Sequence, residues 1–498
     1  MNTKRNTSVL FSCTVLAAAL LLLSGCGHRP HSWDKEVQPA NPAAEFAFRS
    51  AVTEPSAGWT GPVFALSRDY PQANPGDCPK AVCTWLGVDV DFAVKLDAAP
   101  PNWGEPVWDE YMGKVLDYVK EGQDDQLADD VGFRTTIQTN ANGAEDRWYH
   151  VPWMAYDETV GREFIHGTTN ERTAHVSDLI APTQTASLQS TTGVYKLLSD
   201  ECDAKYPNGF ETWAVGMYNP WGGWALGQAW PESGAPQIGE YLGSPMPAGL
   251  PFPEGTVVAK LLFTTAPSAE SAGDDCFAFL NGSPAWTVDR HAVDPVSQEF
   301  MACAREPQTV RLIQMDIAVV DLRSPTRWVY GTFAYDGNVQ NAQTMWDKLV
   351  PVGIQWGSDP WTFPAVPQAE SIPARQSVLN DTDLYEHNGC YGRLAGPVDN
   401  EKSSCISCHA SSYAASDGAP SIMGVNAPAT FGFAGICDNY AQDNVNYFQN
   451  LVAPQAYPGG QFPDTLNLDT SLQMWVAFTQ YGYYNTDGKP NNQCPNLE

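Results

Sequence analysis

The chain has 498 residues, enough for about three domains of ordinary size or for one large domain with extensions. Hydrophobic residues make up 43% of it and charged residues 17%, a balance that excludes disorder driven by charge. Lys and Arg number 27 against 57 Asp and Glu, and the net charge of -30 excludes nucleic acid as an expected partner. With 17 Trp, 39 Pro and 41 Gly, the composition favours short strands joined by turns, so we expect a fold that is mainly β with some α.

The first residues predict export from the cytoplasm. Lys4 and Arg5 precede an apolar run from Val9 to Leu23, which is too short to span a bilayer as a helix and is typical of a secretory signal peptide. The run ends in Leu23-Ser24-Gly25-Cys26, which resembles the bacterial lipobox. The resemblance implies removal of residues 1–25 and lipidation of Cys26. The alternative is an ordinary signal peptide with an incidental cysteine.

A lipid on Cys26 implies a cell-envelope lipoprotein. Gly27 rather than an aspartate follows the cysteine, and resemblance to the lipoprotein sorting rules of enteric bacteria implies the outer membrane, facing the periplasm. Residues 26–44 are rich in Pro, Asn and Ala without hydrophobic periodicity and are predicted to be a tether. Contact with the membrane is expected only through the lipid anchor.

The cysteine count suits an oxidising compartment. Cys13 lies in the signal peptide, Cys26 is assigned to lipid, and Cys405 and Cys408 form a motif described below. Eight of the 12 cysteines remain, an even number that suits four disulfides. Only two pairings are expected from the sequence: Cys78 with Cys83, and Cys276 with Cys303.

We expect residues 45–205 to form a mixed α+β region and residues 206–498 to form a β-rich domain. In the first, the periodicity of Trp108–Lys120 predicts a helix, and Leu86–Leu96 alternates like a half-buried strand. In the second, five runs rich in β-branched and aromatic residues predict strands of one antiparallel sheet. These runs begin at Trp213, Trp224, Gly255, Val310 and Trp328. Leu472–Tyr481 has the spacing of a helix.

The chemistry-bearing motif is Cys405-Ile406-Ser407-Cys408-His409. Two thiols three positions apart can add to the two vinyl groups of a haem, and the adjacent histidine then serves as an axial iron ligand. The motif therefore predicts one covalently attached haem c on Cys405, Cys408 and His409, and we expect residues 206–498 to be a β-rich c-type haem domain. The competing interpretations are a thioredoxin-like redox pair, which lacks a surrounding βαβ pattern, and half of a zinc site, which lacks a second ligand pair.

The sequence alone does not identify the sixth ligand of the iron. A low-spin electron carrier would use methionine or histidine. Met423 lies in a loop and is the better candidate, whereas Met474 lies in an apolar helical pattern and His387 in a polar stretch. Arg393 could pair with a haem propionate or could equally be a solvated arginine. A five-coordinate iron is the remaining alternative.

The strands and the motif together resemble the cytochrome P-460 family. The resemblance covers roughly residues 206–485 and rests on the run GTVVAK from Gly255, a strand with an acid in mid-run, a Trp-led aromatic strand and a late CxxCH motif followed by a helix. It implies an antiparallel β haem domain that acts on hydroxylamine or binds small nitrogen oxides. Position by position, Lys260 matches the lysine that cross-links to haem, Asp316 a distal carboxylate, Trp328 the strand tryptophan and His409 the proximal ligand. A strand-edge lysine facing water is the alternative for Lys260.

Two functions follow from these observations. The leading hypothesis is a monohaem c-type cytochrome lipoprotein that transfers electrons to a redox partner protein. The rival is a haem-dependent oxidoreductase or sensor with an open iron that takes a small nitrogen-oxide ligand, in which Asp316 moves protons and Lys260 is part of the catalytic site. The sequence leaves open whether the protein is an enzyme.

Overall fold

The computed structural model describes part of the chain, and every structural statement below refers to that part. The described residues are 68–92, 106–121, 138–139, 145–146, 148–152, 164–165, 168–174, 200–206, 210–232, 236–241, 244–273, 275–293, 300–357, 375–378, 394, 396–399, 405–410, 412–415, 465–475 and 477–478.

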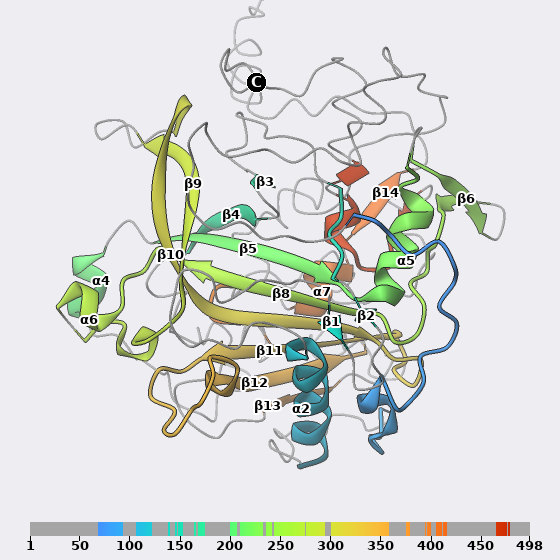
Figure 1. Ribbon diagram of the computed structural model, residues 1–498, viewed down its shortest axis with the longest axis horizontal. Helices are drawn as coiled ribbons and strands as arrows, with labels where there is room; N and C mark the ends of the chain where they lie inside the picture. Colours follow the sequence, from blue (N-terminus) through green and yellow to red (C-terminus); the bar gives the residue numbers. More distant parts are fainter. Residues whose placement is uncertain are drawn as a thin grey trace, which may run out of the picture.

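A nine-stranded antiparallel sheet is the centre of the molecule (Figure 1). Its strand order is β13-β12-β11-β10-β8-β5-β4-β3, and β9 pairs with the first half of the long strand β10. Figure 1 shows the β9–β10 hairpin projecting from one end of the sheet. The strands are β3 (Phe164–Ile165), β4 (Thr168–Ala174), β5 (Phe210–Tyr218), β8 (Val257–Thr264), β9 (Ala285–Val293), β10 (Phe300–Val320), β11 (Trp328–Tyr335), β12 (Leu349–Trp356) and β13 (Arg375–Val378). The predicted class, mainly β with some α, is confirmed.

Short helices and two-stranded pairs surround this sheet. The helices are η1 (Thr84–Gly87), α2 (Pro106–Lys120), α4 (Asp200–Lys205), α5 (Pro220–Ala229), α6 (Ala269–Ala272), η2 (Ala278–Leu280), η3 (Trp346–Lys348) and α7 (Cys405–Ala410). The two-stranded pairs are β1 (Gln138–Thr139) with β2 (Glu145–Asp146), β6 (Ile238–Tyr241) with β7 (Ser244–Pro247), and β14 (Tyr413–Ala415) with β15 (Thr465–Asn467). Residues 472–475 and 477–478 are also helical.

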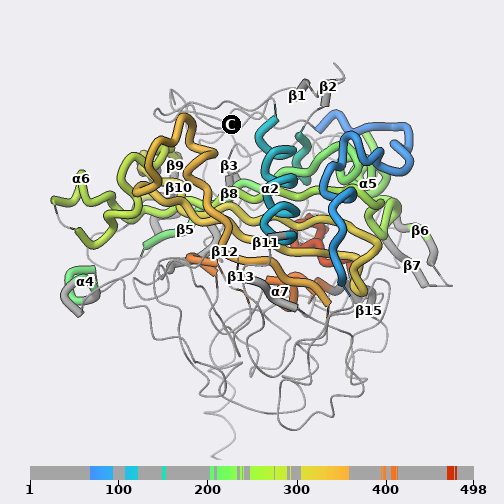
Figure 2. The backbone as a smooth tube through the Cα atoms, turned by 90° about the horizontal axis from the view of Figure 1, so that it is seen from below, coloured from blue at the N-terminus to red at the C-terminus, as the bar shows by residue number. Residues whose placement is uncertain are grey.

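The two faces of the sheet carry separate cores. Side chains alternate along β10, so Ile317 and Val319 enter one core while Ala318 and Val320 enter the other. The first core is covered by α2, and the second by α5, α7 and the helical residues 472–475 and 477–478. Figure 2 shows α2 and α7 on opposite sides of the sheet. The CxxCH motif therefore lies on the face away from α2, which we call the α7 face.

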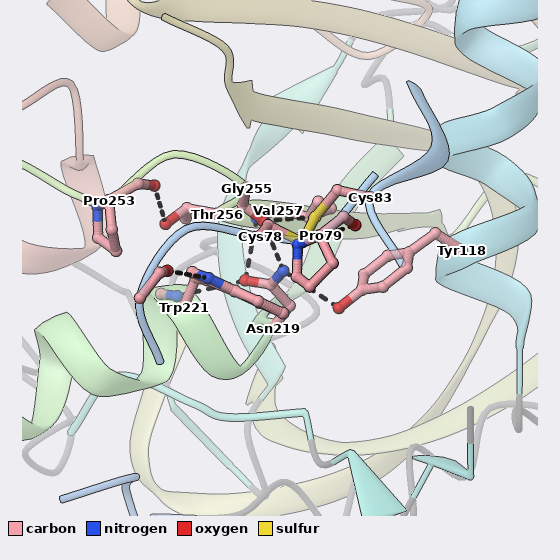
Figure 3. The surroundings of a disulfide bond; sticks show 12 residues. Cys78, Pro79, Cys83, Tyr118, Asn219, Trp221, Pro253, Gly255, Thr256 and Val257 are labelled. Carbon is pink, nitrogen blue, oxygen red and sulfur yellow. Dashed lines mark hydrogen bonds between the residues drawn. A yellow bond between two sulfur atoms is a disulfide. The ribbon is translucent and has the colours of Figure 1, made fainter. Parts of the chain in front are cut away.

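The predicted Cys78–Cys83 disulfide is present, and it lies against the start of β8. A side chain at Gly255, whose φ is +87°, would meet Cys78 Cβ at 2.3 Å, so this close approach requires glycine. Asn219 bonds the same segment: its side chain accepts from Val257 N (3.0 Å) and donates to Gly255 O (2.8 Å) and Tyr118 Oη (3.1 Å). Figure 3 shows these groups around the disulfide, and the hydrogen bonds of Asn219 connect Tyr118 of α2 with the segment that enters β8.

The expected pairing of Cys276 with Cys303 is wrong. Cys276 forms a disulfide with Cys202, across a sequence separation of 74 residues. Cys202 lies on α4, and Cys276 precedes η2. Tertiary packing brings these two segments together, and sequence proximity carries no information about it.

Four of the five predicted strand runs are strands of the sheet, and the run from Trp224 is not. It lies in α5, where Asn219 caps the helix by accepting from Gly222 N and Pro220 occupies the first turn. The predicted strand Leu86–Leu96 is not a strand in its described part, because residues 86–87 lie in η1 and residues 88–92 belong to no strand, while residues 93–96 lie outside the described residues. Its alternation is nevertheless real, because Val88, Val90 and Phe92 are buried between exposed neighbours.

The domain boundary predicted near residue 205 stays a prediction. The sheet itself runs across it, because β4 pairs with β5 from Thr168↔Val215 to Ala174↔Phe210. Residues of η1 and α2 also share the first core with β8 and β10. The signal peptide and the tether lie outside the described residues.

Candidate functional site

The motif forms the short helix α7, and its three chemically active residues share one face. Cys405, Cys408 and His409 have helical spacing i, i+3 and i+4 and are partly exposed. The other three residues of the helix, Ile406, Ser407 and Ala410, are buried. Packing of the opposite face therefore fixes the orientation in which α7 presents its two thiols and its imidazole.

Neither motif cysteine is in a disulfide, whereas four other described cysteines form disulfides. Cys405 is held from both sides: its N–H donates to Leu394 O (3.1 Å), and its Sγ lies 3.8 Å from Asp399 Oδ2 and 3.9 Å from Thr332 Oγ1. Burial raises the pKa of the Cys405 thiol well above its usual range, and the nearby Asp399 and Asp316 raise it further. A thiol with a raised pKa is a poor nucleophile, which argues against a thioredoxin-like redox pair.

His409 is oriented by a backbone carbonyl. Its Nδ1 lies 3.1 Å from Thr470 O. Because a carbonyl oxygen only accepts, Nδ1 carries the hydrogen, and Nε2 of the neutral ring then carries the lone pair. The Tyr330 ring packs beside the imidazole, with centroids 5.0 Å apart and the planes tilted by 45°. A donor bond from one ring nitrogen is the usual way in which proteins orient a metal-binding histidine.

Lys260 and Asp316 are direct neighbours on the α7 face. They are register partners between β8 and β10. The row continues on one side to Gly216 of β5 and on the other to Thr332 of β11 and Gly353 of β12. Lys260 and Asp316 are partly exposed, as are the three active residues of α7. The structure thus brings the two residues predicted as catalytic to the same face as the motif.

The side-chain amide of Gln314 bridges the carboxylates of Asp316 and Asp399. Gln314 Nε2 donates to Asp316 Oδ1 (2.7 Å) and to Asp399 Oδ2 (3.1 Å), while its Oε1 accepts from Val398 N (2.9 Å). Thr332 Oγ1 also donates to Asp316 Oδ1, at 2.9 Å. Burial raises the pKa of Asp316 well above its usual range, and the charge of Asp399 adds to this rise. With both donors on Oδ1, a proton bound by Asp316 resides on Oδ2.

The remaining predicted site residues divide into two groups. Cys26, Arg393 and Met423 lie outside the described residues, as does His387. Met474 is fully buried in the second core together with Ile406 and Tyr330, as its apolar helical pattern indicated.

The sequence reasoning missed four residues that build this site: Gln314, Thr332, Asp399 and Thr470. Two of them had a signal, because Gln314 stands two positions before Asp316 and so shares its face of the strand. Thr332 is likewise on the α7 face of the Trp-led strand, four positions after Trp328. Asp399 and the Thr470 carbonyl come from loops, which carry no such periodicity.

Two features of this face are compatible with the predicted covalent haem: the shared orientation of Cys405, Cys408 and His409, and the tautomer of His409. Within the described residues, no group of three or more His, Cys, Asp and Glu side chains is placed to hold a metal ion by itself. The described helices include none with the length and apolarity needed to cross a membrane. No family model, no curated protein and no solved structure matches this chain.

Proposed function

We propose that the protein is a monohaem c-type cytochrome lipoprotein of the bacterial cell envelope that transfers electrons to a redox partner protein. The observation that carries the proposal is the partly exposed face of α7, on which Cys405, Cys408 and the carbonyl-oriented His409 lie together. Cys405 and Cys408 would hold the group through thioether bonds, and His409 Nε2 would ligate its iron. When bound, the haem supplies reversible one-electron exchange.

The chain's own residues would control the surroundings of that group. Tyr330 and Thr470 fix the imidazole, and Ile406 anchors α7 in the second core. The raised pKa of the Cys405 thiol disfavours premature disulfide formation between the two cysteines of the motif. The acidic surface favours a basic partner by long-range attraction.

The test of haem attachment is the double variant Cys405→Ala, Cys408→Ala. Acidified organic solvent removes haem that lacks thioether bonds. After extraction, the variant is therefore expected to hold no haem, while the parent keeps its haem. The matched control is Cys202→Ala, Cys276→Ala, which also removes two cysteines but outside the motif. Haem that stays on the Cys405→Ala, Cys408→Ala protein through extraction would contradict the proposal.

A second candidate is a cytochrome P-460-like haem enzyme or sensor that acts on hydroxylamine or nitric oxide. The specific observation in its favour is the register pair Lys260–Asp316 on the α7 face, with Asp316 hydrogen-bonded to Thr332, whose Oγ1 lies 3.9 Å from Cys405 Sγ. Asp316 could hold a proton on Oδ2 and exchange it with a bound nitrogen compound. In this candidate Lys260→Ala restores an ordinary c-type absorption spectrum if the lysine is cross-linked.

A further inference from the structure

We propose that Asp469 is a positioning residue that aims the Thr470 carbonyl at His409 and thereby fixes which nitrogen of the imidazole carries the lone pair. The effect on an iron rests on the proposed function, whereas the effect on the imidazole does not. Nothing in the motif indicates this role, because Asp469 follows His409 by 60 positions in the sequence.

The first observation is the backbone of the turn. Asp469 and Thr470 have φ values of 51° and 64°, so two consecutive residues other than glycine adopt the left-handed conformation. Residues other than glycine rarely adopt this conformation, and they keep it only when the surrounding structure enforces it. The turn therefore needs specific contacts to hold the carbonyl of Thr470 in place.

The Asp469 carboxylate makes those contacts. Its Oδ2 accepts from Phe252 N (2.6 Å), and its Oδ1 accepts from Trp328 Nε1 (3.0 Å). Arg327 Nη1 lies 3.2 Å from Oδ1 and 3.3 Å from Oδ2, and Arg327 Nη2 donates to Phe252 O. The side chain of Asp469 is only 2% exposed. Three donors from two segments, Phe252 and the consecutive residues Arg327 and Trp328, thus fix one buried carboxylate, and with it the start of the turn.

Thr470 is held by Tyr330 of β11, the next residue after Trp328 on the same face of the strand. Tyr330 Oη donates to Thr470 Oγ1 at 2.6 Å, and the Tyr330 ring packs beside the His409 imidazole. Trp328 and Tyr330 are two positions apart on the same face of β11, so one strand holds two consecutive turn residues. Ser412 Oγ donates to Ser471 O (2.8 Å), which joins the turn to the segment after α7. The carbonyl and the imidazole are therefore fixed to one frame.

Replacing Asp469 by asparagine tests this arrangement with little change in shape. The carboxamide keeps one acceptor oxygen and presents N–H donors where the other oxygen accepted, so it opposes Phe252 N in one orientation and Trp328 Nε1 in the other. We expect the turn to relax and Thr470 O to lose its fixed position beside Nδ1. The matched control is Asp321→Asn, since Asp321 is also a buried carboxylate paired with an arginine, Arg323, but bonds Tyr111 of α2 on the other side of the sheet.

The first measurement needs no haem. In the mature Cys405→Ala, Cys408→Ala chain labelled with ¹⁵N-histidine, nitrogen chemical shifts report the tautomer of His409. We expect a single Nδ1–H tautomer, lost to a mixture on adding Asp469→Asn and kept on adding Asp321→Asn. A single Nδ1–H tautomer that survives Asp469→Asn would overturn the proposal, as would loss of that tautomer in both variants.

The second measurement uses the haem-bearing protein and decides alone if the haem-free chain does not fold. Spectroelectrochemical titration is expected to show a shifted midpoint potential in Asp469→Asn and an unchanged one in Asp321→Asn, although both lower the melting temperature. Equal potentials in Asp469→Asn and the parent would overturn the positioning role. A parent protein without covalent haem would instead reject the proposed function, and the tautomer of its His409 would still decide the role of Asp469.

Discussion

Asp316 of β10 and Thr332 of β11 are neighbours on adjacent strands, and the Thr332 hydroxyl donates a 2.9 Å hydrogen bond to the Asp316 carboxylate. The same hydroxyl oxygen lies 3.9 Å from the thiol of Cys405. One threonine therefore connects an acidic group of the sheet with the attachment motif. This relationship makes Asp316 the titratable group through which pH is expected to act on the site.

The first prediction concerns stability against pH. Burial and the charge of Asp399 raise the pKa of Asp316 in the folded chain, so the folded state binds this proton more tightly than the unfolded state, in which an aspartate titrates near 3.9. The contribution is favourable below the unfolded pKa and is lost as pH rises through the folded pKa. We expect Asp316→Asn to remove this loss of stability. The free energy of unfolding, measured by urea titration at each pH, should then decline less between the unfolded and the folded pKa of Asp316.

The control for this experiment has the opposite sign. Partial burial raises the pKa of Asp347, but hydrogen bonds from Gln343 N (2.8 Å) and Thr344 N (2.9 Å) outweigh it and lower the pKa overall. The ionised Asp347 carboxylate therefore adds to stability as pH rises, and Asp347→Asn is expected to lower the free energy of unfolding above the unfolded pKa of aspartate. Parallel pH profiles for Asp316→Asn and the parent would contradict the raised pKa of Asp316.

The second prediction concerns the contact between Gly396 and Gln314. A Cβ at Gly396 would lie 2.2 Å from Gln314 Nε2 and 2.5 Å from its Cδ, so Gly396→Ala must displace the amide that bridges Asp316 and Asp399. We expect a loss of about 1–3 kcal/mol in the free energy of unfolding. In a Gln314→Ala background the clash is gone, so the same change should cost less than about 0.5 kcal/mol. Equal costs in both backgrounds would show that the bridge is not the reason for the glycine.

Much of this arrangement was predictable from local patterns, and the reasons for the failures are physical. Alternation found β5, β8, β10 and β11, because each buries one set of side chains in each core. The run from Trp224 misled because its aromatic residues suit a strand as well as a buried helix, and the cap at Asn219 decides between them. The pairing of Cys202 with Cys276 and the use of the Thr470 carbonyl depend on contacts between distant segments, which leave no local pattern.

The third prediction concerns anchoring. If Cys26 carries the lipid, Cys26→Ala should release the processed protein from membranes, and the soluble fraction after high-salt washing and centrifugation measures this. Cys13→Ala is the matched control, because Cys13 lies inside the predicted signal peptide and its loss should leave the protein on the membrane. A processed Cys26→Ala protein that stays on washed membranes would show that the lipid is not the anchor.

The last prediction separates the two proposed functions at the sixth iron position. If Met423 is the ligand of an electron carrier, the ferric protein should be low-spin with a methionine-to-iron charge-transfer band, and Met423→Ala should abolish that band. Met474 provides the control, because it is fully buried in the second core and its loss creates a cavity there. Met474→Ala should cost about 2–5 kcal/mol of stability and leave the band in place. A ferric protein that is high-spin, and a ferrous protein that binds nitric oxide without losing a protein ligand, would favour the enzyme or sensor. In that case Asp316→Asn should slow any hydroxylamine oxidation, since the variant cannot accept a proton beside the motif.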